Sequence, residues 1–483
     1  MKKQLLSIVA VAGALILNAQ VTLVKEINDA GSSNSSPANL TVHNGQIFFS
    51  ADDSNGSNTP GGAHLGKELW VTDGTSTGTT FVKDIRTGNS SSNPGNLFTF
   101  NNKLYFTAFD TSSELWTSDG TEAGTTKVDL MSTITGESPQ RFVELDGLAY
   151  FTVGGQPGST TGETVNKLVQ WDGVNDAVQV ADVGAGYEVI LQNMIVFNNQ
   201  IFMYMNYSTE DATVGNELYA YNPTADTFSL IKDIDTGTGD SSISNFTILG
   251  STLYFEADNS LWKTDGTTAG TLAVASASTL AGIANLYAWN DLLFFEGDDG
   301  TNGDQLYVFN PTLDTVTNIS NISGSDNNHD PEDFTAYNGY VYYSGENGTS
   351  SDKFLFRTDG VTVSQLDATI KEIDEVTVLN GMLYFEGNNG STGKELYSFD
   401  PSTLSVDNTQ AEIISVYPNP TSDYIMVPTT LVNTNYTIHD LSGKQVSQGV
   451  ISSEKIELNL NSGMYLLNIK TDLSSITKKI MVK

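Results

Sequence analysis

The stretch ELWVTDGTSTGTTFVKDI, residues 68–85, gathers residue types that could do chemistry. Trp70 beside Asp73-Gly74-Thr75 and a series of hydroxyl side chains would suit a sugar pocket or a metal-binding loop. Asp73 could equally cap a turn, because an Asx side chain accepts a hydrogen bond from the backbone two residues on and the following glycine supplies a positive φ. The number of equivalent positions elsewhere in the chain separates these two interpretations.

Three glutamates, Glu256, Glu296 and Glu386, each stand directly after an aromatic pair. A glycosidase needs two carboxyl groups at a set separation, one of them with a raised pKa. Such a pair in a channel would make a hydrolase or lyase that uses Asp and Glu alone. The three glutamates share one position of a repeat, however, which favours a structural polar residue over catalysis.

Calcium is the cofactor candidate that the sequence offers, and no other cofactor is expected. Hard oxygen ligands gather in the loops 50–62, 297–304 and 323–333, as Ca²⁺ prefers, although none has EF-hand spacing. The candidate ligands that we single out are Asp298, Asp299 and Asp304. The alternative is that these acidic, glycine-containing loops are simply solvated turns.

Two sequence elements recur eight times and define a repeat. The first is a polar turn pair followed by apolar and mostly aromatic residues, as in NGQIFF (44–49), NNKLYF (101–106) and NGMLYF (380–385). The second is the opening motif, in which Leu holds the second position and Asp or Asn stands four residues later, followed by Gly or Pro. Asp73 therefore has seven equivalents, which favours a strand corner over a catalytic group, and Trp70 alternates with Tyr and Phe as a packing residue.

Each repeat predicts four short strands, which is typical of a β-propeller blade. The segment 21–40 aligns with 79–97, so the chain should begin at the fourth strand of a unit and complete the last blade. The repeat starts favour eight blades. Seven blades remain the alternative, because TLSVDN (403–408) could supply a fourth strand of its own.

These motifs resemble those of the ELWxxDGT-repeat proteins, a group of secreted bacterial proteins. Residues 68–75 and 114–121 match the signature fully, and 260–267 departs from it in having Ser260 in place of Glu. The resemblance covers residues 21–410 and implies an architecture without a particular activity. The corners are also similar to the Asp-boxes of sialidase propellers. Sialidases bind a carboxylate with three converging arginines, but Arg86, Arg141 and Arg357 occupy different registers of this repeat, so we do not expect them to converge.

From about Glu412 the repeat stops, and alternating apolar runs with glycine turns predict a small β-sandwich. Its ordered motifs resemble a type IX secretion sorting domain of the A type. The resemblance implies a sorting signal that includes Pro418, Asn419, Pro420, Gly443, Gly463, Tyr465, Lys478 and Lys479. It also implies contact with the type IX machinery, followed by surface attachment or release. The alternative is an ordinary small β-domain beside the propeller.

Composition sets further limits on location and partners. The net charge of −35 argues against nucleic acid, since little in the chain would neutralise phosphates. The chain has no cysteine, which excludes disulfides and thiolate sites. Lys2-Lys3 and the apolar run 5–17 predict a signal peptide cleaved between Ala19 and Gln20, and no other run is long enough to insert into a membrane.

The expected chain is therefore all-β: a signal peptide (1–19), a β-propeller (20–410) and a C-terminal sorting domain (411–483). We expect a secreted or outer-surface protein that binds or adheres to a glycan or protein whose identity the sequence leaves open. One alternative is the Asp/Glu hydrolase or lyase, and another is a structural surface-layer or matrix protein. An enzyme is the less favoured of these, and no nucleic-acid partner is expected.

Overall fold

The computed structural model describes residues 21–59, 62, 64–130, 138–153, 167–180, 192–205, 211–324, 328–404, 417, 419–428, 431–440, 444–470 and 475–483. These residues fall into two compact units, the first ending at Pro401 and the second beginning at Ser402. Both units are built from β-strands, and among the described residues no helix is long and apolar enough to cross a membrane. The predicted cleavage site at Ala19 and Gln20 lies outside the described residues.

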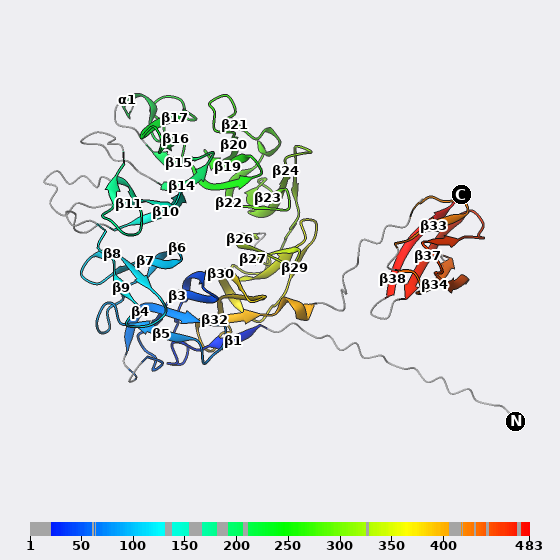
Figure 1. The fold of residues 1–483 in the computed structure, drawn as a ribbon, viewed down its shortest axis with the longest axis horizontal. Helices are drawn as coiled ribbons and strands as arrows, with labels where there is room; N and C mark the ends of the chain where they lie inside the picture. The colour runs from blue at the N-terminus through cyan, green and yellow to red at the C-terminus, as the bar shows by residue number, and fades with distance from the viewer. Residues whose placement is uncertain are drawn as a thin grey trace. The chain divides into compact units, whose positions relative to one another are not determined.

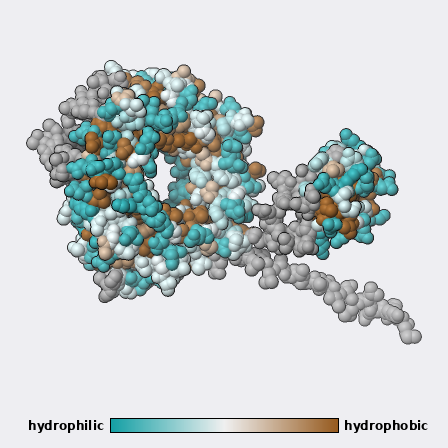
Figure 2. Space-filling model, viewed as in Figure 1, coloured by the Kyte–Doolittle hydropathy of each residue, from teal (hydrophilic) through white to brown (hydrophobic). Residues whose placement is uncertain are grey.

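The described part of the first unit contains eight four-stranded antiparallel sheets arranged in a ring (Figure 1), and the space-filling view shows a channel at its centre (Figure 2). Four of them, each from its innermost strand outward, are β2 (Ala38–His43), β3 (Gln46–Asp53), β4 (Leu65–Thr72) and β5 (Thr80–Lys83); β6 (Gly95–Phe100), β7 (Lys103–Phe109), β8 (Ser113–Ser118) and β9 (Thr126–Lys127); β10 (Gln140–Leu145), β11 (Leu148–Val153), β12 (Lys167–Trp171) and β13 (Val178–Gln179); and β14 (Gln192–Phe197), β15 (Gln200–Met205), β16 (Glu217–Asn222) and β17 (Thr227–Lys232).

The other four are β18 (Ser244–Leu249), β19 (Thr252–Ala257), β20 (Ser260–Thr264) and β21 (Leu272–Ala273); β22 (Ala281–Trp289), β23 (Leu292–Asp298), β24 (Gln305–Asn310) and β25 (Thr315–Asn318); β26 (Glu332–Tyr337), β27 (Tyr340–Glu346), β28 (Lys353–Thr358) and β29 (Val363–Gln365); and β30 (Lys371–Leu379), β31 (Met382–Asn388), β32 (Lys394–Phe399) and β1 (Thr22–Lys25). A short helix, α1 (Asp211–Val214), and a 3-10 turn, η2 (Ala275–Ala277), complete this unit, and a second 3-10 turn, η3 (Pro401–Leu404), begins at its last residue. Each innermost strand contacts the next, and β30 contacts β2, so the ring is closed. This is the β-propeller that the repeat predicts.

The N-terminal strand closes the ring, as predicted from the alignment of 21–40 with 79–97. β1 pairs antiparallel with β32, placing Thr22 opposite Ser398 and Leu23 opposite Tyr397. The edge of this last sheet, for which residues 403–408 were the alternative strand, is thus occupied by β1. Within the alternative strand 403–408, Thr403 and Leu404 lie in η3, and residues 405–408 lie outside the described residues.

The glutamate of the opening motif is a buried structural acceptor that joins one sheet to the next. Glu68 is fully buried and accepts hydrogen bonds from the backbone N–H of Ile85 (3.1 Å) and of Ser92 (2.9 Å). The Ser92 hydroxyl donates to the same carboxylate at 2.5 Å. The connection between β5 and β6 is thereby held against β4. Burial raises the pKa of Glu68 to about 7, although these three hydrogen bonds lower it.

The DGT segments are strand corners, which confirms that prediction. Asp73 Oδ1 accepts hydrogen bonds from the backbone N–H of Thr75 (2.9 Å) and from its hydroxyl (2.7 Å). Gly74 has a φ of +95°, and a Cβ there would lie 2.1 Å from the Tyr384 hydroxyl of the neighbouring sheet. Glycine is needed for both reasons, since a side chain would strain the backbone and push the two sheets apart. Trp70 is 1% exposed and packs in the core between these sheets, so it is no sugar platform.

The second unit contains the sheet β35-β34-β37-β38 and the pair β33-β36. Their bounds are β33 (Tyr424–Met426), β34 (Asn435–Asp440), β35 (Gln445–Val450), β36 (Lys455–Glu457), β37 (Gly463–Lys470) and β38 (Ser475–Val482). A core of its own, which includes Ile425, Ile438, Leu467 and Ile480, lies between them. This small all-β unit agrees with the sandwich that the alternating pattern predicts.

Candidate binding site in the central channel

Every innermost strand contains a β-bulge whose extra residue has a left-handed backbone. The eight bulge residues, at φ between 48° and 62°, are Asn39, Asn96, Arg141, Asn193, Asn245, Asn285, Asp333 and Glu375. Bulges re-aim side chains and occur often beside functional sites. Asn and Asp tolerate this backbone well, whereas Arg and Glu do so at a cost. Five of these bulge residues, together with the residue that follows each, line cavities on the innermost strands, which are only partly buried.

Two adjoining cavities make a continuous groove along this channel wall. One of about 350 Å³ is lined by Arg141, Phe142, Asn193, Met194, Asn245 and Phe246. The other, of about 280 Å³, is lined by Asn245, Phe246, Thr247, Asn285, Leu286, Tyr287, Asp333 and Phe334. Because Asn245 and Phe246 line both, the cavities form one surface across β10, β14, β18, β22 and β26, which we call the channel groove. The space-filling view shows the hollow that these strands surround (Figure 2).

Arg141 lies at one end of the channel groove. No hydrogen bond or ion pair joins its side chain to another described residue, and burial lowers the pKa of its guanidinium from the usual value. The other two arginines are engaged elsewhere: Arg86 donates to the Ser91 carbonyl at 3.3 Å, and Arg357 lies 4.2 Å from the centre of the Tyr340 ring. The structure therefore does not gather the three arginines into one site, as the sequence also led us to expect.

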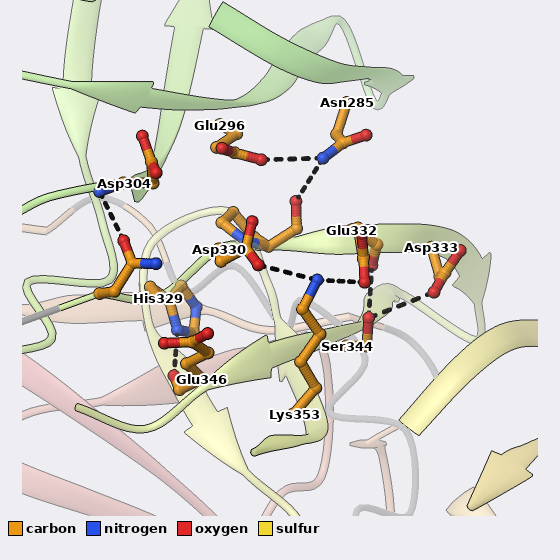
Figure 3. Close-up of polar contacts among 12 residues, drawn as sticks. Asn285, Glu296, Asp304, His329, Asp330, Glu332, Asp333, Ser344, Glu346 and Lys353 are labelled. Atoms are coloured by element: carbon orange, nitrogen blue, oxygen red, sulfur yellow. Dashed lines mark hydrogen bonds and ion pairs between the residues drawn. The ribbon is translucent and has the colours of Figure 1, made fainter. Parts of the chain in front are cut away.

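The opposite end of the channel groove is acidic. Asp333 accepts a hydrogen bond from the Glu375 backbone N–H at 3.1 Å, and each of Glu332, Asp333 and Asp374 offers a carboxylate oxygen within 4.8 Å of the others. Burial, then the hydrogen bond and negative charge of Asp374, raise the pKa of Asp333 to about 8. Lys353 forms ion pairs with Asp330 (2.9 Å) and with Glu332, so part of this charge is neutralised (Figure 3).

Glu296 is held close to this acidic end. Its carboxylate accepts a hydrogen bond from Asn285 Nδ2 at 2.8 Å, and the same amide donates to the Pro331 carbonyl at 3.2 Å (Figure 3). Burial, with the charges of Asp330 and Asp304, raises the pKa of Glu296 to about 8. A bulge asparagine thus links β22 to the segment that precedes β26.

The three glutamates singled out from the sequence do not form one site. They lie on β19, β23 and β31, in three different sheets, and each has local partners. Glu256 accepts hydrogen bonds from the Ser244 hydroxyl (2.6 Å) and the Asn259 N–H (2.9 Å), and Glu386 pairs with Lys394 Nζ at 2.7 Å. These contacts favour the structural interpretation of all three residues.

The predicted calcium ligands also act mainly as turn residues. Asp298 Oδ1 accepts a hydrogen bond from the Gly300 N–H at 2.7 Å, and Asp299 Oδ1 accepts one from the Thr301 N–H at 2.9 Å. Burial, with the charges of Asp298 and Asp330, raises the pKa of Asp304. Among the described residues, one group of carboxylates lies close enough together to share an ion: Glu332, Asp333 and Asp374. This group includes none of the predicted calcium ligands. Calcium at 297–304 stays a prediction.

Sequence reasoning missed the bulge residues as a set, although a signal for them exists. Each bulge residue stands five positions before the first residue of a recurring turn, as Asn39 stands before Asn44 and Arg141 before Asp146. In each case a large apolar residue follows directly, such as Leu40 after Asn39. A search for this dipeptide at a fixed distance from the turn would have found the ring.

The described sorting-signal residues meet on one sheet of the second unit. Asn419 Nδ2 donates to the Lys479 carbonyl at 2.8 Å, and Asn419 Oδ1 accepts a hydrogen bond from the Met481 N–H at 2.9 Å. Gly463 and Tyr465 begin β37, which pairs with β38 along its length. The Asn419-Pro420 peptide bond is cis, Lys478 and Lys479 lie in β38, and Pro418 and Gly443 lie outside the described residues.

Comparison with known proteins identifies this second unit. A family model described as a secretion system C-terminal sorting domain matches residues 415–483. No curated protein matches the chain. Structures of similar fold include a puromycin hydrolase, at 11% identity and a TM-score of 0.45, where the match covers 77% of this chain and 60% of the hydrolase. This chain therefore corresponds to less than two thirds of that protein.

Two further solved structures are similar to this chain at low identity. The β-propeller domain of the trilobed protease from Pyrococcus furiosus is 13% identical with a TM-score of 0.35, covering 69% of this chain and 84% of that domain. PorZ, a surface component of the type IX secretion system of Porphyromonas gingivalis, is 12% identical with a TM-score of 0.27, covering 93% and 75%. The C-terminal unit is a type IX secretion sorting domain, which indicates a protein exported to the outer surface or the extracellular space.

Proposed function

We propose that this exported propeller is a binding module that takes a carbohydrate in its channel groove. The observation that carries the proposal is the continuous groove across five innermost strands, lined by both polar bulge residues and large apolar side chains. Ligand sites in proteins are concave surfaces of this kind, largely apolar with a few convergent polar groups.

The residue types of the groove suit a saccharide. Amide side chains at Asn193 and Asn245 offer donors and acceptors of the kind that sugar hydroxyls require, and Asn285, whose amide N–H groups are already bonded, offers its oxygen as an acceptor. Phe142 and Phe246 are half-buried, and their rings present apolar surface against which the C–H face of a sugar could pack. The acidic surface of the protein argues against a polyanionic polymer along its whole length, because like charges would repel.

A glycoside hydrolase is the second candidate, favoured by the raised pKa of Asp333 beside Asp374. A protonated acid next to an ionised one could serve as a general acid and base. The carboxyl groups of Asp333 and Asp374 are hydrogen-bonded to each other, however, and so lie closer together than the roughly 5–5.5 Å of a retaining enzyme or the roughly 6.5–9.5 Å of an inverting one. Binding without turnover is therefore the preferred function.

The test is to apply the full chain to an array of neutral and acidic glycans and to analyse the solutions by mass spectrometry. Phe246→Ala, which alters both cavities, should abolish binding. Leu40→Ala changes the equivalent position of β2, outside the groove, and should bind as the wild type does. Cleaved products would favour the hydrolase and make Asp333 the first residue to replace. Equal binding by both variants would contradict a site in the groove.

A further inference from the structure

We propose that the cavity around Arg141 selects sugars that carry an anionic group, either the carboxylate of a uronic acid or a sulfate ester. This inference rests on the proposed carbohydrate-binding function and specifies its ligand class. The Arg141 cavity is the 350 Å³ part of the channel groove, formed by β10, β14 and β18.

Arg141 has a left-handed backbone conformation that is unusual for an arginine. Five of the eight bulge positions hold asparagine, the residue that suits a left-handed backbone best, and Arg141 adopts the same conformation at φ 57°. A long, unbranched cation gains nothing from this backbone, which is strained relative to a right-handed or extended one. Strained residues that persist at equivalent positions often mark a functional site, because the surrounding structure has to offset the strain.

Arg141 also has no counter-ion among the residues that the structure describes. The chain has 57 acidic residues against 22 basic ones, yet no acidic side chain among the described residues pairs with Arg141. Glu375, the other non-Asx bulge residue, differs in this respect. Its Oε2 accepts a hydrogen bond from the Leu40 N–H at 3.1 Å across the point where the ring closes, so its role is structural. Arg141 makes no such structural contact within the part of the chain that the structure describes.

The residues that line the Arg141 cavity suit an anionic sugar. The Arg141 cavity is bordered by two amides, two aromatic rings and a methionine, and no carboxylate of a described residue lines it. One amide N–H of Asn245 donates to the Ser244 hydroxyl at 2.8 Å, which leaves the second N–H of that amide for a ligand. A guanidinium presents paired donors that match a carboxylate or a sulfate, while the rings offer apolar surface to the sugar.

The charge pattern of the groove also orients the ligand. Asp333 lines the far cavity, and Glu332 and Asp374 lie beside it, so a second anionic group there would be repelled. The anionic sugar should therefore sit at β10, with neutral sugars extending over β18 towards β26. A saccharide with a single acidic residue should bind better than one that is acidic at every position.

The test uses the full chain and an array of matched oligosaccharides. The members of each set differ only in the terminal sugar, which is neutral, oxidised to the uronate or sulfated at position 6. Affinities of the bound members are then measured by titration calorimetry. The uronate or the sulfate should bind at least 10-fold more tightly than its neutral match, and comparison of the two identifies the natural anionic group. Arg141→Asn should weaken the acidic ligand about 10- to 100-fold and leave the neutral one unchanged, as expected for loss of a charge-assisted contact.

Controls separate this inference from the proposed function. Arg86→Gln removes one positive charge outside the groove and should leave the preference intact, and Arg141→Lys should restore only part of it. Equal affinities for acidic and neutral members, unchanged by Arg141→Asn, would overturn the inference while the carbohydrate function stands. Failure of every glycan to bind would overturn both. Asparagine is the residue found at five equivalent positions, so misfolding of Arg141→Asn is not expected.

Discussion

Replacing Glu395 tests how the propeller is closed. Glu395 of β32 is fully buried and accepts hydrogen bonds from the N-terminal segment: from the Ile27 N–H (2.7 Å), the Asn28 N–H (3.3 Å) and the Ser35 hydroxyl (2.6 Å). The pattern copies that of Glu68, so the ends of the chain are joined by the same device that links consecutive sheets. Glu395→Ala leaves three buried donors without this acceptor.

The magnitude follows from those donors and from the pKa of Glu395. Each unpaired buried donor costs about 1–3 kcal/mol, so the three together should cost roughly 3–9 kcal/mol when the wild-type carboxyl is protonated. Burial raises the pKa of Glu395 from 4.5 to about 7. The stabilising contribution of a group with a raised folded-state pKa is present below its unfolded pKa and declines as the pH rises through the folded one. The free energy of unfolding that Glu395→Ala removes should therefore be smaller at pH 8 than at pH 5, by about 3 kcal/mol.

The assay is urea denaturation of the wild type and Glu395→Ala at pH 5 and at pH 8. Glu122→Ala, at an exposed corner, is the matched control and should change stability by less than about 0.5 kcal/mol. Hydrogen exchange at Thr22–Lys25 should also accelerate in Glu395→Ala, because β1 loses its anchor. A Glu395→Ala protein as stable as the control, or one destabilised more at pH 8 than at pH 5, would refute the reasoning.

Three further predictions follow from single positions. Gly78→Ala should lower stability by about 1–3 kcal/mol in thermal unfolding, since its Cβ would lie 2.0 Å from Asp73 Oδ1 and would break that corner; an unchanged midpoint would contradict this. The stability of the wild type should fall between about pH 4.5 and pH 8, because Glu296 has a raised pKa, and Glu296→Gln removes this contribution. In urea titrations at the two pH values, the fall should be smaller in Glu296→Gln by roughly 3–5 kcal/mol. An equal fall in the wild type and the variant would count against this prediction. Arg141→Asn should raise stability by about 1 kcal/mol through relief of backbone strain, and destabilisation in the same assay would show that the guanidinium has a structural role.

The fold could be predicted from sequence wherever a local rule repeats. Asn-Gly turns, the Asp73 corner and the alignment of 21–40 with 79–97 each depend on short-range chemistry, and eight copies make them visible. The strand β1 could be placed beside β32 for the same reason. The role of Glu68 could not be predicted in this way, because its partners Ile85 and Ser92 lie in the connection between β5 and β6. A buried hydrogen-bond acceptor also looks like any other polar residue in a sequence.

The candidate site was harder to predict because bulges interrupt the alternation of the innermost strands. The extra residue at Arg141 breaks the two-residue period, so the sequence QRFVEL indicates a strand but not which side chains face the channel. The sequence also drew attention to Glu256 and Glu386, whose hydrogen-bonding partners lie within their own sheets. Charge clusters were informative only once the sheets had placed Asp333 beside Asp374.

The central claim, that the channel groove is the ligand site, is tested most directly by hydrogen–deuterium exchange of the full chain with and without a saccharide that binds on the array. The account predicts protection of backbone amides in β10, β14, β18, β22 and β26, with the largest change around Arg141 and Phe246. Protection confined to the outer strands or to the DGT corners, with the innermost strands unchanged, would contradict it.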